Sequence, residues 1–431
     1  MSPVTVSRAL AALGAEGLVV TRPGAGTFVA QPPAHGDPVD HSWQTVALDE
    51  RAIDTEGLSQ LFDPPHDDGL ISLSTGYLHP SLLPVRTLSA ALARAARLPD
   101  VWDRPPVAGL HALRSWFAKS AAPGIDARDV LVTPGGQGAI TTILRAVVPA
   151  GDPLLVESPT YPGALAVARA GGIRPVPVPT DADGVIPELL AEAFARTGAK
   201  AFYCQPTYQN PTGTVLSADR RAAVLEASSA AGAFVIEDDF ARWLSHGLRP
   251  PPPLLAEDTE GRVIYITSLT KVASGSLRIG AAIARGPVAH RIGALRVVDD
   301  MFVPRPMQEA TIELVTRAAW GQHLRELSAA LNRRAERLAG ALAEHVPAVS
   351  LPSRPPGGLH LWVRLPAHID DVELSLAARR AGVVVAAGRA FYPAEAPAPH
   401  LRLTFSSASS ETDIDTGVRR LAFAEPELTR T

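Results

Sequence analysis

Lysine and cysteine are scarce in this 431-residue chain, which has only three lysines, Lys119, Lys200 and Lys271. A single cysteine, Cys204, excludes an internal disulfide framework and fits a reducing compartment. No uninterrupted apolar stretch reaches the roughly 18 residues that a spanning helix needs, and no signal-peptide pattern opens the chain. A net charge of −4 indicates that the chain as a whole is not a polyanion binder, so any contact with nucleic acid must be local. We therefore expect a soluble, cytoplasmic protein with no membrane partner.

The composition that is present favours a large folded core. The hydrophobic fraction is 46%, and the length favours two or three domains. Apolar strand-like runs alternate with helical patterns at 139–148 and 218–231, which is typical of an α/β domain with a mostly parallel sheet flanked by helices. We predict this domain over residues 70–320 and a smaller α+β domain over 321–431. The runs lie at 130–133, 154–157, 175–178, 201–204, 233–238 and 263–268, and the smaller domain has helical patterns at 323–345 and 372–381 and strand-like segments at 359–365 and 401–405.

The first 30 residues predict one helix and a hairpin. Ser2 is a favourable N-cap, Pro3 suits the first helical position, and Gly17 ends the apolar periodicity. Short strands are expected at 18–21 and 27–30. A unit of this size cannot bury a core alone. Residues 31–69, rich in Pro, His and Asp, are predicted to be a linker.

The environment of Lys271 is the most informative motif. A β-branched run ends in hydroxyl residues, then Lys271, and Arg278 follows seven positions later. A lysine that follows an apolar strand should be partly desolvated, which lowers its pKa and makes it a nucleophile. An amine for an aldehyde, with donors for a phosphate, is what a pyridoxal phosphate site requires.

Loops after two other predicted strands carry polar or aromatic groups of the kinds that a pyridoxal phosphate site uses. Gly136 and Gln137 open a helix, where backbone N–H groups can approach an anion, although such a sequence can also be a simple turn. Tyr161 could stack on a flat heterocycle or pack on the domain surface.

Two further strand ends carry an amide and a carboxylate. Asn210 stands before two turn-forming residues. Asp238 leaves an apolar run, and a buried carboxylate needs a cation or a strong donor. That partner could be a protonated pyridine nitrogen, but a helix cap or a salt bridge with Arg242 would serve equally.

Together these segments resemble the fold-type I pyridoxal-phosphate enzymes, the aspartate aminotransferase superfamily, over about residues 70–425. The similarity rests on the Asn-Pro-Thr-Gly segment that begins at Asn210, the aspartate 28 residues later, and the Ser-x-Thr-Lys motif followed by an arginine. The resemblance implies that Lys271 attaches covalently to pyridoxal 5′-phosphate and that Asp238 pairs with its pyridine nitrogen. Tyr161 would stack on the ring, and Asn210 would bond its phenolic oxygen. The phosphate would be held by Gly136, Gln137, Ser268, Thr270 and Arg278.

The same resemblance concerns two more positions. Arg402, in the strand-like segment 400–405, looks like the family's arginine that grips a substrate α-carboxylate as a bidentate fork. Phe240 departs from the family, which usually has tyrosine two residues after the aspartate. The missing hydroxyl removes a hydrogen bond to the phenolate of the cofactor, and we expect this loss to slow a transaminase more than it hurts a sensor.

The N-terminal segment resembles the recognition helix and wing of a GntR-type winged helix-turn-helix. Such a unit linked to an aminotransferase-like domain is the arrangement of MocR-type transcriptional regulators. In these proteins the recognition helix enters the major groove, while the wing and helix ends hold phosphates. The family's DNA-binding domain begins with helices that should precede Ser2, so we expect this unit to be partial and poorly folded. Either the start of the chain is misassigned or the protein has lost DNA binding. The implied DNA-binding residues are Thr5, Ser7, Arg8, Arg22 and Gly24.

Two functions therefore stand as hypotheses. The first is a homodimeric MocR-type regulator in which an amine or amino acid displaces Lys271 from the cofactor and changes DNA binding. DNA is a partner only if the N-terminal domain is complete. The second is an aminotransferase with a vestigial DNA-binding segment, in which Lys271 would also move a proton as general acid and base. Whether transamination turns over is left open by the sequence.

Overall fold

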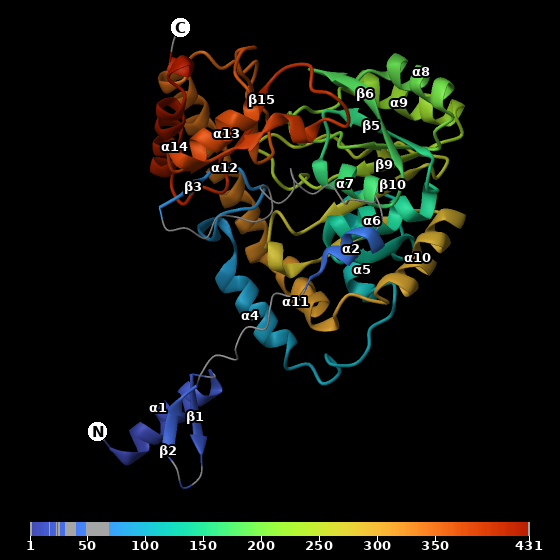
Figure 1. Cartoon of the computed structure of the whole chain (residues 1–431). Helices are drawn as coiled ribbons and strands as arrows, with labels where there is room; N and C mark the ends of the chain where they lie inside the picture. Colours follow the sequence, from blue (N-terminus) through green and yellow to red (C-terminus); the bar gives the residue numbers. More distant parts are fainter. Residues whose placement is uncertain are drawn as a thin grey trace. The chain divides into compact units, whose positions relative to one another are not determined.

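The computed structural model describes residues 2–16, 18–22, 24, 26–30, 40–48 and 69–429 (Figure 1). The chain divides into two compact units, residues 1–52 and 53–431.

The N-terminal unit contains the helix and hairpin that the sequence predicts. Helix α1 (Pro3–Ala15) precedes strands β1 (Val19–Arg22) and β2 (Gly26–Val29), which pair antiparallel. Ser2 is the N-cap residue, but its side chain makes no capping hydrogen bond. The helix is capped at Glu16, and Gly17, the predicted helix end, lies outside the described residues. A short helix, α2 (Ser42–Ala47), lies in the segment that we predict to be a linker.

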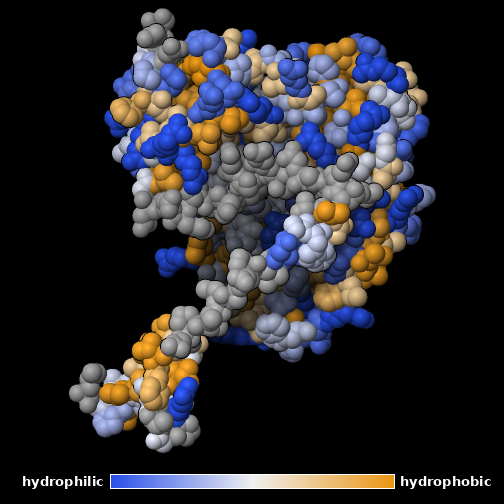
Figure 2. All heavy atoms as spheres, in the orientation of Figure 1, coloured by the Kyte–Doolittle hydropathy of each residue, from blue (hydrophilic) through white to orange (hydrophobic). Residues whose placement is uncertain are grey.

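Apolar side chains of this unit lie on its surface. None of the residues of α1 is buried, and Val20 and Phe28 of the hairpin are each 49% exposed. Figure 2 shows hydrophobic atoms on the visible surface of this unit. The described part of the unit thus has no core of its own, as its size predicts.

The second unit is built on an eight-stranded sheet that is mostly parallel, as predicted. Strands β10, β9, β8, β5 and β6 pair parallel, whereas β11 pairs antiparallel with both β10 and β4. Because β11 reverses direction, it places the end of β10 beside the end of β4. In sheet order the strands are β4 (Val130–Thr133), β11 (Gly280–Ile283), β10 (Val263–Ser268), β9 (Phe234–Asp238), β8 (Ala201–Cys204), β5 (Pro153–Ser158), β6 (Arg174–Asp181) and β7 (Gly184–Val185).

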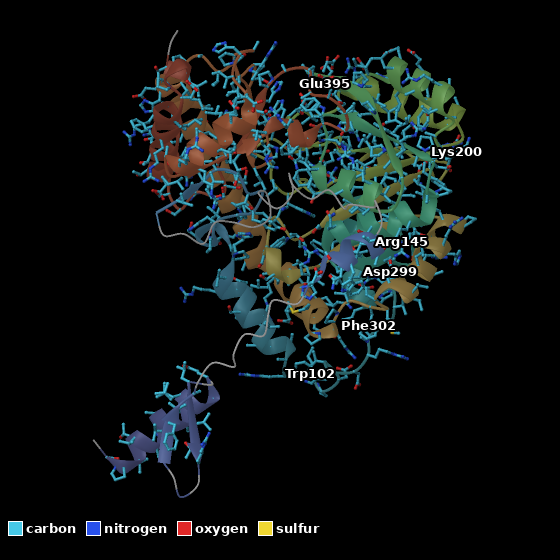
Figure 3. All side chains as sticks on the ribbon, in the orientation of Figure 1. Trp102, Arg145, Lys200, Asp299, Phe302 and Glu395 are labelled. Carbon is cyan, nitrogen blue, oxygen red and sulfur yellow. The ribbon has the colours of Figure 1, made fainter. Side chains whose placement is uncertain are left out.

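Helices cover both faces of this sheet, and successive strand residues belong to different cores. In β4, Leu131 packs in the core with α6, α7 and α10, whereas Val130 and Val132 pack in the larger core on the other face. Arg145 of α6 and Asp299 of α10 form an ion pair that joins two helices of the first face (Figure 3). The helices of this region are α4 (Val85–Ala95), α5 (His111–Ala121), α6 (Gly135–Val147), α7 (Pro162–Ala170), α8 (Pro187–Thr197), α9 (Ala218–Ala230), α10 (Pro287–Asp299) and α11 (Arg305–Val315).

The 28-residue helix α12 (Ala318–His345) leads into the smaller α+β region. Its antiparallel sheet has the order β12 (His360–Arg364), β15 (His400–Thr404) and β14 (Ala386–Ala387). The sheet packs with α12 and α13 (Asp371–Arg380), and α14 (Glu411–Ala424) packs against α12. Strand β13 (Val383–Val384) pairs with β3 (Ile71–Ser72), so the first residues of the predicted large domain join the layers of the small one. Short 3₁₀ turns are η1 (Pro80–Leu82), η2 (Ala127–Asp129), η3 (Leu254–Ala256), η4 (Gly275–Leu277), η5 (Gly388–Phe391) and η6 (Pro426–Thr429).

Within the described ranges, no helix combines the length and the apolar character needed to cross a bilayer.

Candidate functional site

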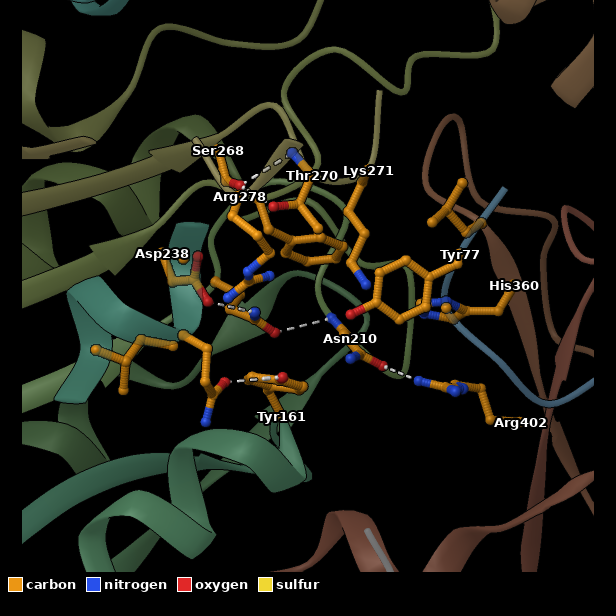
Figure 4. Close-up of a pocket in the computed structure, with 17 residues that line it drawn as sticks. Tyr77, Tyr161, Asn210, Asp238, Ser268, Thr270, Lys271, Arg278, His360 and Arg402 are labelled. Carbon is orange, nitrogen blue, oxygen red and sulfur yellow. Dashed lines mark hydrogen bonds between the residues drawn. The ribbon is translucent and has the colours of Figure 1, made fainter. Parts of the chain in front are cut away.

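A cavity of about 780 Å³, counting its open mouth, lies where the carboxyl ends of the parallel strands meet the start of α6. The ends of parallel strands are where α/β folds commonly bind ligands. The structure brings all eleven predicted cofactor and carboxylate residues into the lining of this cavity (Figure 4). They are Gly136, Gln137, Tyr161, Asn210, Asp238, Phe240, Ser268, Thr270, Lys271, Arg278 and Arg402.

Lys271 lies three residues beyond the end of β10 and reaches into the cavity. Its Nζ lies 3.5 Å from the ring centroid of Tyr77, and it makes no hydrogen bond or ion pair with the described residues. Burial, together with the positive charges of Arg402 and Arg278, lowers its pKa from 10.5 to about 7. The predicted desolvation of this lysine is therefore confirmed, and its amine is available as a nucleophile near neutral pH.

That pKa predicts a pH profile for cofactor attachment. The neutral amine is the reactive form, and its fraction rises as pH increases through about 7. We expect the rate constant for attachment to rise about tenfold between pH 6 and pH 8 and then level off. An ordinary lysine would instead keep gaining reactivity until about pH 10. Stopped-flow absorbance of cofactor-free protein mixed with pyridoxal phosphate measures this profile. A rate that still climbs steeply between pH 8 and pH 10 would contradict the lowered pKa.

Three consecutive carboxylates at the end of β9 have separate partners. Glu237 accepts hydrogen bonds from the backbone N–H groups of Leu254 and Leu255, at 2.9 and 3.0 Å. Asp239 pairs with Arg242, which shows that the salt bridge considered for Asp238 belongs to its neighbour.

Asp238 is the carboxylate that faces the cavity. Its Oδ2 accepts hydrogen bonds from Tyr203 at 2.6 Å and Gln205 at 2.9 Å, while Oδ1 accepts none from the described residues. Burial raises its pKa to about 6, so a cationic partner at Oδ1 would stabilise its ionised form. A protonated pyridine nitrogen has that charge and donor.

An anion cradle lies at the N-terminus of α6. Gly135 has φ +77°, and a Cβ there would lie 3.1 Å from the Arg278 guanidinium and from Thr270 Oγ1, so the backbone and the cation fit closely only with glycine. Arg278 donates to the Pro134 carbonyl at 2.7 Å, and Ser268 donates to Thr270 Oγ1 at 2.7 Å. A guanidinium, two hydroxyls and a helix N-terminus match a phosphate.

Asn210 and Tyr161 occupy the middle of the cavity. Asn210 Oδ1 accepts a hydrogen bond from Arg402 at 3.1 Å, and its NH₂ group donates to none of the described residues. Tyr161 donates to Gln137 Oε1 at 3.0 Å, and Gln137 also donates to the Gly163 carbonyl at 3.1 Å. The side chain of Gln137 thus positions the tyrosine. The backbone N–H of Gln137 is the group that remains suited to a phosphate.

Arg402 comes from β15 of the smaller region and is only 4% exposed. It donates to Asn210 and to the Ser74 carbonyl, while its Nε has no partner among the described residues. No carboxylate in the described part of the chain pairs with it, and burial lowers its pKa to about 10. A buried guanidinium in this state is suited to a ligand carboxylate.

Six further residues line the cavity without having been predicted from the sequence. Tyr77 follows a two-residue strand and carries no recognisable motif, and Gln205 becomes informative only through its bond to Asp238. His360 occupies an ordinary strand position. The six are Gly76, Tyr77, Ile140, Gln205, Leu359 and His360.

The lining fits pyridoxal 5′-phosphate. Lys271 would attach to the aldehyde, Asp238 Oδ1 would face the pyridine nitrogen, and the cradle at Gly135 would hold the phosphate. When bound, this cofactor supplies a reactive aldehyde and a ring that withdraws electrons from a bound amine.

The predicted DNA-binding residues lie in the other unit. Thr5, Ser7 and Arg8 are exposed on α1, Arg22 ends β1, and Gly24 lies in the turn of the hairpin with φ +78°.

Comparisons with known proteins find two kinds of relative. One is an HTH-type transcriptional regulator named YdfD, from Bacillus subtilis, which is 26% identical over 98% of this chain and 89% of its own length. Another is a 2-aminoadipate transaminase from Thermus thermophilus, 28% identical over 86% of this chain and 94% of its own length.

Solved structures agree with the fold. The α-aminoadipate aminotransferase LysN of Thermus thermophilus, solved with N-(5′-phosphopyridoxyl)-L-leucine, superposes with a TM-score of 0.79. It is 28% identical, with coverage of 84% of this chain and 93% of that one. The family model for aminotransferase class I and II matches residues 70–421. The chain therefore belongs to the aminotransferase class I and II family, whose cofactor, pyridoxal 5′-phosphate, is the one that the sequence predicts.

Proposed function

We propose that this protein is a MocR-type transcriptional regulator of the GntR group, which binds an amino acid at its pyridoxal phosphate site and changes its DNA binding in response. The proposal rests on the share of this chain that each relative matches. Three HTH-type regulators match 98%, 95% and 97% of the chain, whereas the 2-aminoadipate transaminase matches 86%. A match of 98% leaves about nine of 431 residues unaligned, so it extends through most of the N-terminal unit.

The geometry of the N-terminal unit supports a role in DNA binding. Helix α1 followed directly by the β1–β2 hairpin has the order of a recognition helix and wing. Thr5 and Arg8 are three residues apart and therefore share one face of α1. Arg22 lies over the ring of Phe28, 5.8 Å from its centroid, which holds a positive charge at the hairpin. In these positions the helix could contact base edges and the hairpin could contact phosphates.

The ligand would join two parts of the second unit. Arg402 belongs to the smaller α+β region. Lys271 and Asn210 follow strands of the large sheet, and Asp238 is the last residue of one. A carboxylate bound by Arg402 and an amine held near Lys271 would draw these parts together. Lys271, once its amine is free, can hold the proton that the incoming ligand gives up, because its pKa is about 7. A change in closure of this kind provides the two states that a regulator needs.

The working assembly in this proposal is a homodimer, as is typical of fold-type I aminotransferases. Large apolar side chains on the surface of the second unit support it: Trp102, Val298 and Met301 are 78%, 75% and 56% exposed. Figure 3 labels Trp102 at the edge of this unit. A dimer places two DNA-binding units for two half-sites.

The test is binding of the full chain to DNA from its neighbouring promoter, by fluorescence anisotropy over a range of salt. We expect affinity that falls with salt and changes when amino acids are added. Replacing Arg8 and Arg22 together by alanine should reduce the slope of log affinity against log salt by about 2, since two phosphate contacts are lost. Arg128→Ala, which removes an exposed arginine of the second unit, is the matched control and should leave the slope unchanged. DNA binding that is independent of both salt and amino acids would refute the proposal.

An aminotransferase is the second candidate, favoured by the completeness of the cofactor site. Lys271 and Asp238 have the environments that proton transfer and electron withdrawal require. Phe240, however, lines the cavity without the hydroxyl that the family usually has there. Conversion of an amino acid to its keto acid in many turnovers per site, with no effect of that amino acid on DNA binding, would establish the enzyme and exclude the regulator.

A further inference from the structure

His360 is a buried polar residue of the cavity with no hydrogen bond. It is 3% exposed, lines the cavity, and has no partner for Nδ1 or Nε2 among the described residues. Buried polar groups are nearly always paired in folded proteins, and an exception inside a binding cavity points to a missing partner. The imidazole of His360 is therefore a candidate for contact with whatever the cavity binds.

The ring of His360 is neutral. Burial, assisted by the positive charge of Arg402, places its pKa well below the ordinary value of 6.5. The Gln209 carbonyl lies near enough to favour a ring N–H slightly, although not in hydrogen-bonding geometry. A neutral imidazole has one N–H donor and one acceptor nitrogen. With the N–H turned towards Gln209, the other nitrogen is left as an acceptor.

His360 lies on the ligand side of the cavity. In the antiparallel pair of β12 and β15, Trp362 is opposite Arg402 and His360 is opposite Thr404, so His360 and Arg402 share one face of the sheet. Figure 4 shows His360 beside Tyr77, on the side that carries Arg402 and away from Asp238 and Ser268. A ligand whose carboxylate reaches Arg402 thus places its side chain within the reach of this face.

We propose that His360 is a specificity-determining residue, which accepts a hydrogen bond from the side chain of the bound amino acid and so selects side chains with an uncharged O–H or N–H donor. The inference rests on the proposed function, in that the cavity takes an amino acid through Arg402. A basic side chain carries donors, but burying its charge beside the neutral imidazole would leave that charge unpaired. A side-chain carboxylate lacks a donor for the imidazole, and an aliphatic side chain leaves the imidazole unpaired.

The experiment is a spectrophotometric titration of the full-length, cofactor-loaded protein with pairs of amino acids of nearly equal shape. L-Threonine against L-valine and L-asparagine against L-leucine differ in the donor, and L-aspartate adds a charge. We expect the donor-bearing member of each pair to change the visible spectrum of the bound cofactor at about tenfold lower concentration. In His360→Phe, which keeps a ring but no nitrogen, the ratio within each pair should fall to about 1.

Two further variants separate recognition from packing. His360→Gln keeps an acceptor and should restore part of the preference. His400→Phe is the matched control, because His400 is also a histidine of this sheet, stacks on Trp362 and does not line the cavity; it should keep the wild-type ratio. Spectra that respond to amino acids without any preference, or a preference that survives in His360→Phe, would overturn the inference and leave the proposed function standing. Equal weakening of every amino acid in His360→Phe would also overturn it. No spectral response to any amino acid would refute both.

Discussion

Lys271→Ala is expected to abolish covalent attachment of the cofactor and the visible absorption of the purified protein. Lys271 is the lysine of the cavity, and its Nζ is the amine within reach of an aldehyde bound there. The other two lysines of the chain serve as controls, because neither lines the cavity. Lys119 is exposed on α5, and Lys200 is exposed and donates to the Ala231 carbonyl.

Absorbance spectra of Lys119→Ala and Lys200→Ala should match the wild type. Borohydride reduction followed by mass spectrometry of peptides should place the cofactor's mass on the peptide that contains residue 271. A reduced adduct on either of the other lysines would show that the cavity is not the cofactor site.

Arg402→Met is expected to weaken binding of amino acids by about a hundredfold, while affinity for amines without a carboxylate stays nearly the same. Two charge-assisted hydrogen bonds to a carboxylate contribute about 3 kcal/mol together, which corresponds to that factor. Methionine matches much of the apolar stem of arginine but carries no charge. The measurement is a spectral titration of each variant with an amino acid and with its decarboxylated amine.

Arg402→Lys serves as the partner variant, because it keeps the charge and loses the bidentate fork. We expect it to recover part of the affinity for amino acids. Equal losses for the amino acid and the amine in Arg402→Met would mean that the substitution disturbs the cavity as a whole, for example through the bond of Arg402 to Asn210.

The sheet could be predicted closely from the sequence because its strands are apolar on both faces and end in polar loops. The runs at 130–133, 201–204 and 263–268 coincide with β4, β8 and β10. Strand β11 was missed, since Gly280–Ile283 contains two alanines and a glycine, which have little preference for strands. It forms because β4 and β10 offer backbone partners on both sides.

The residues of the site also differ in whether the sequence could predict them. Those that end a strand or open a helix, such as Asp238 and Gly136, could be predicted because the topology alone brings them to one edge. Tyr77 and His360 could not, because their importance depends on what they face: the ammonium of Lys271 for one, and the part of the cavity beside Arg402 for the other. The DNA-binding residues remain a prediction, since the described part of the N-terminal unit shows their exposure and not their partner.

The reversed strand β11 also determines the order in which the cavity can be completed during synthesis. Gly280 pairs with Thr133, so the anion cradle closes when the chain has been made as far as Ile283. Asp238, Lys271 and Arg278 all precede Ile283 in the chain, and domains fold from the N-terminus as they emerge from the ribosome. His360 and Arg402 follow 77 and 119 residues after Ile283. The residues that would hold the vitamin-derived group are therefore made before the two residues that would contact an amino acid.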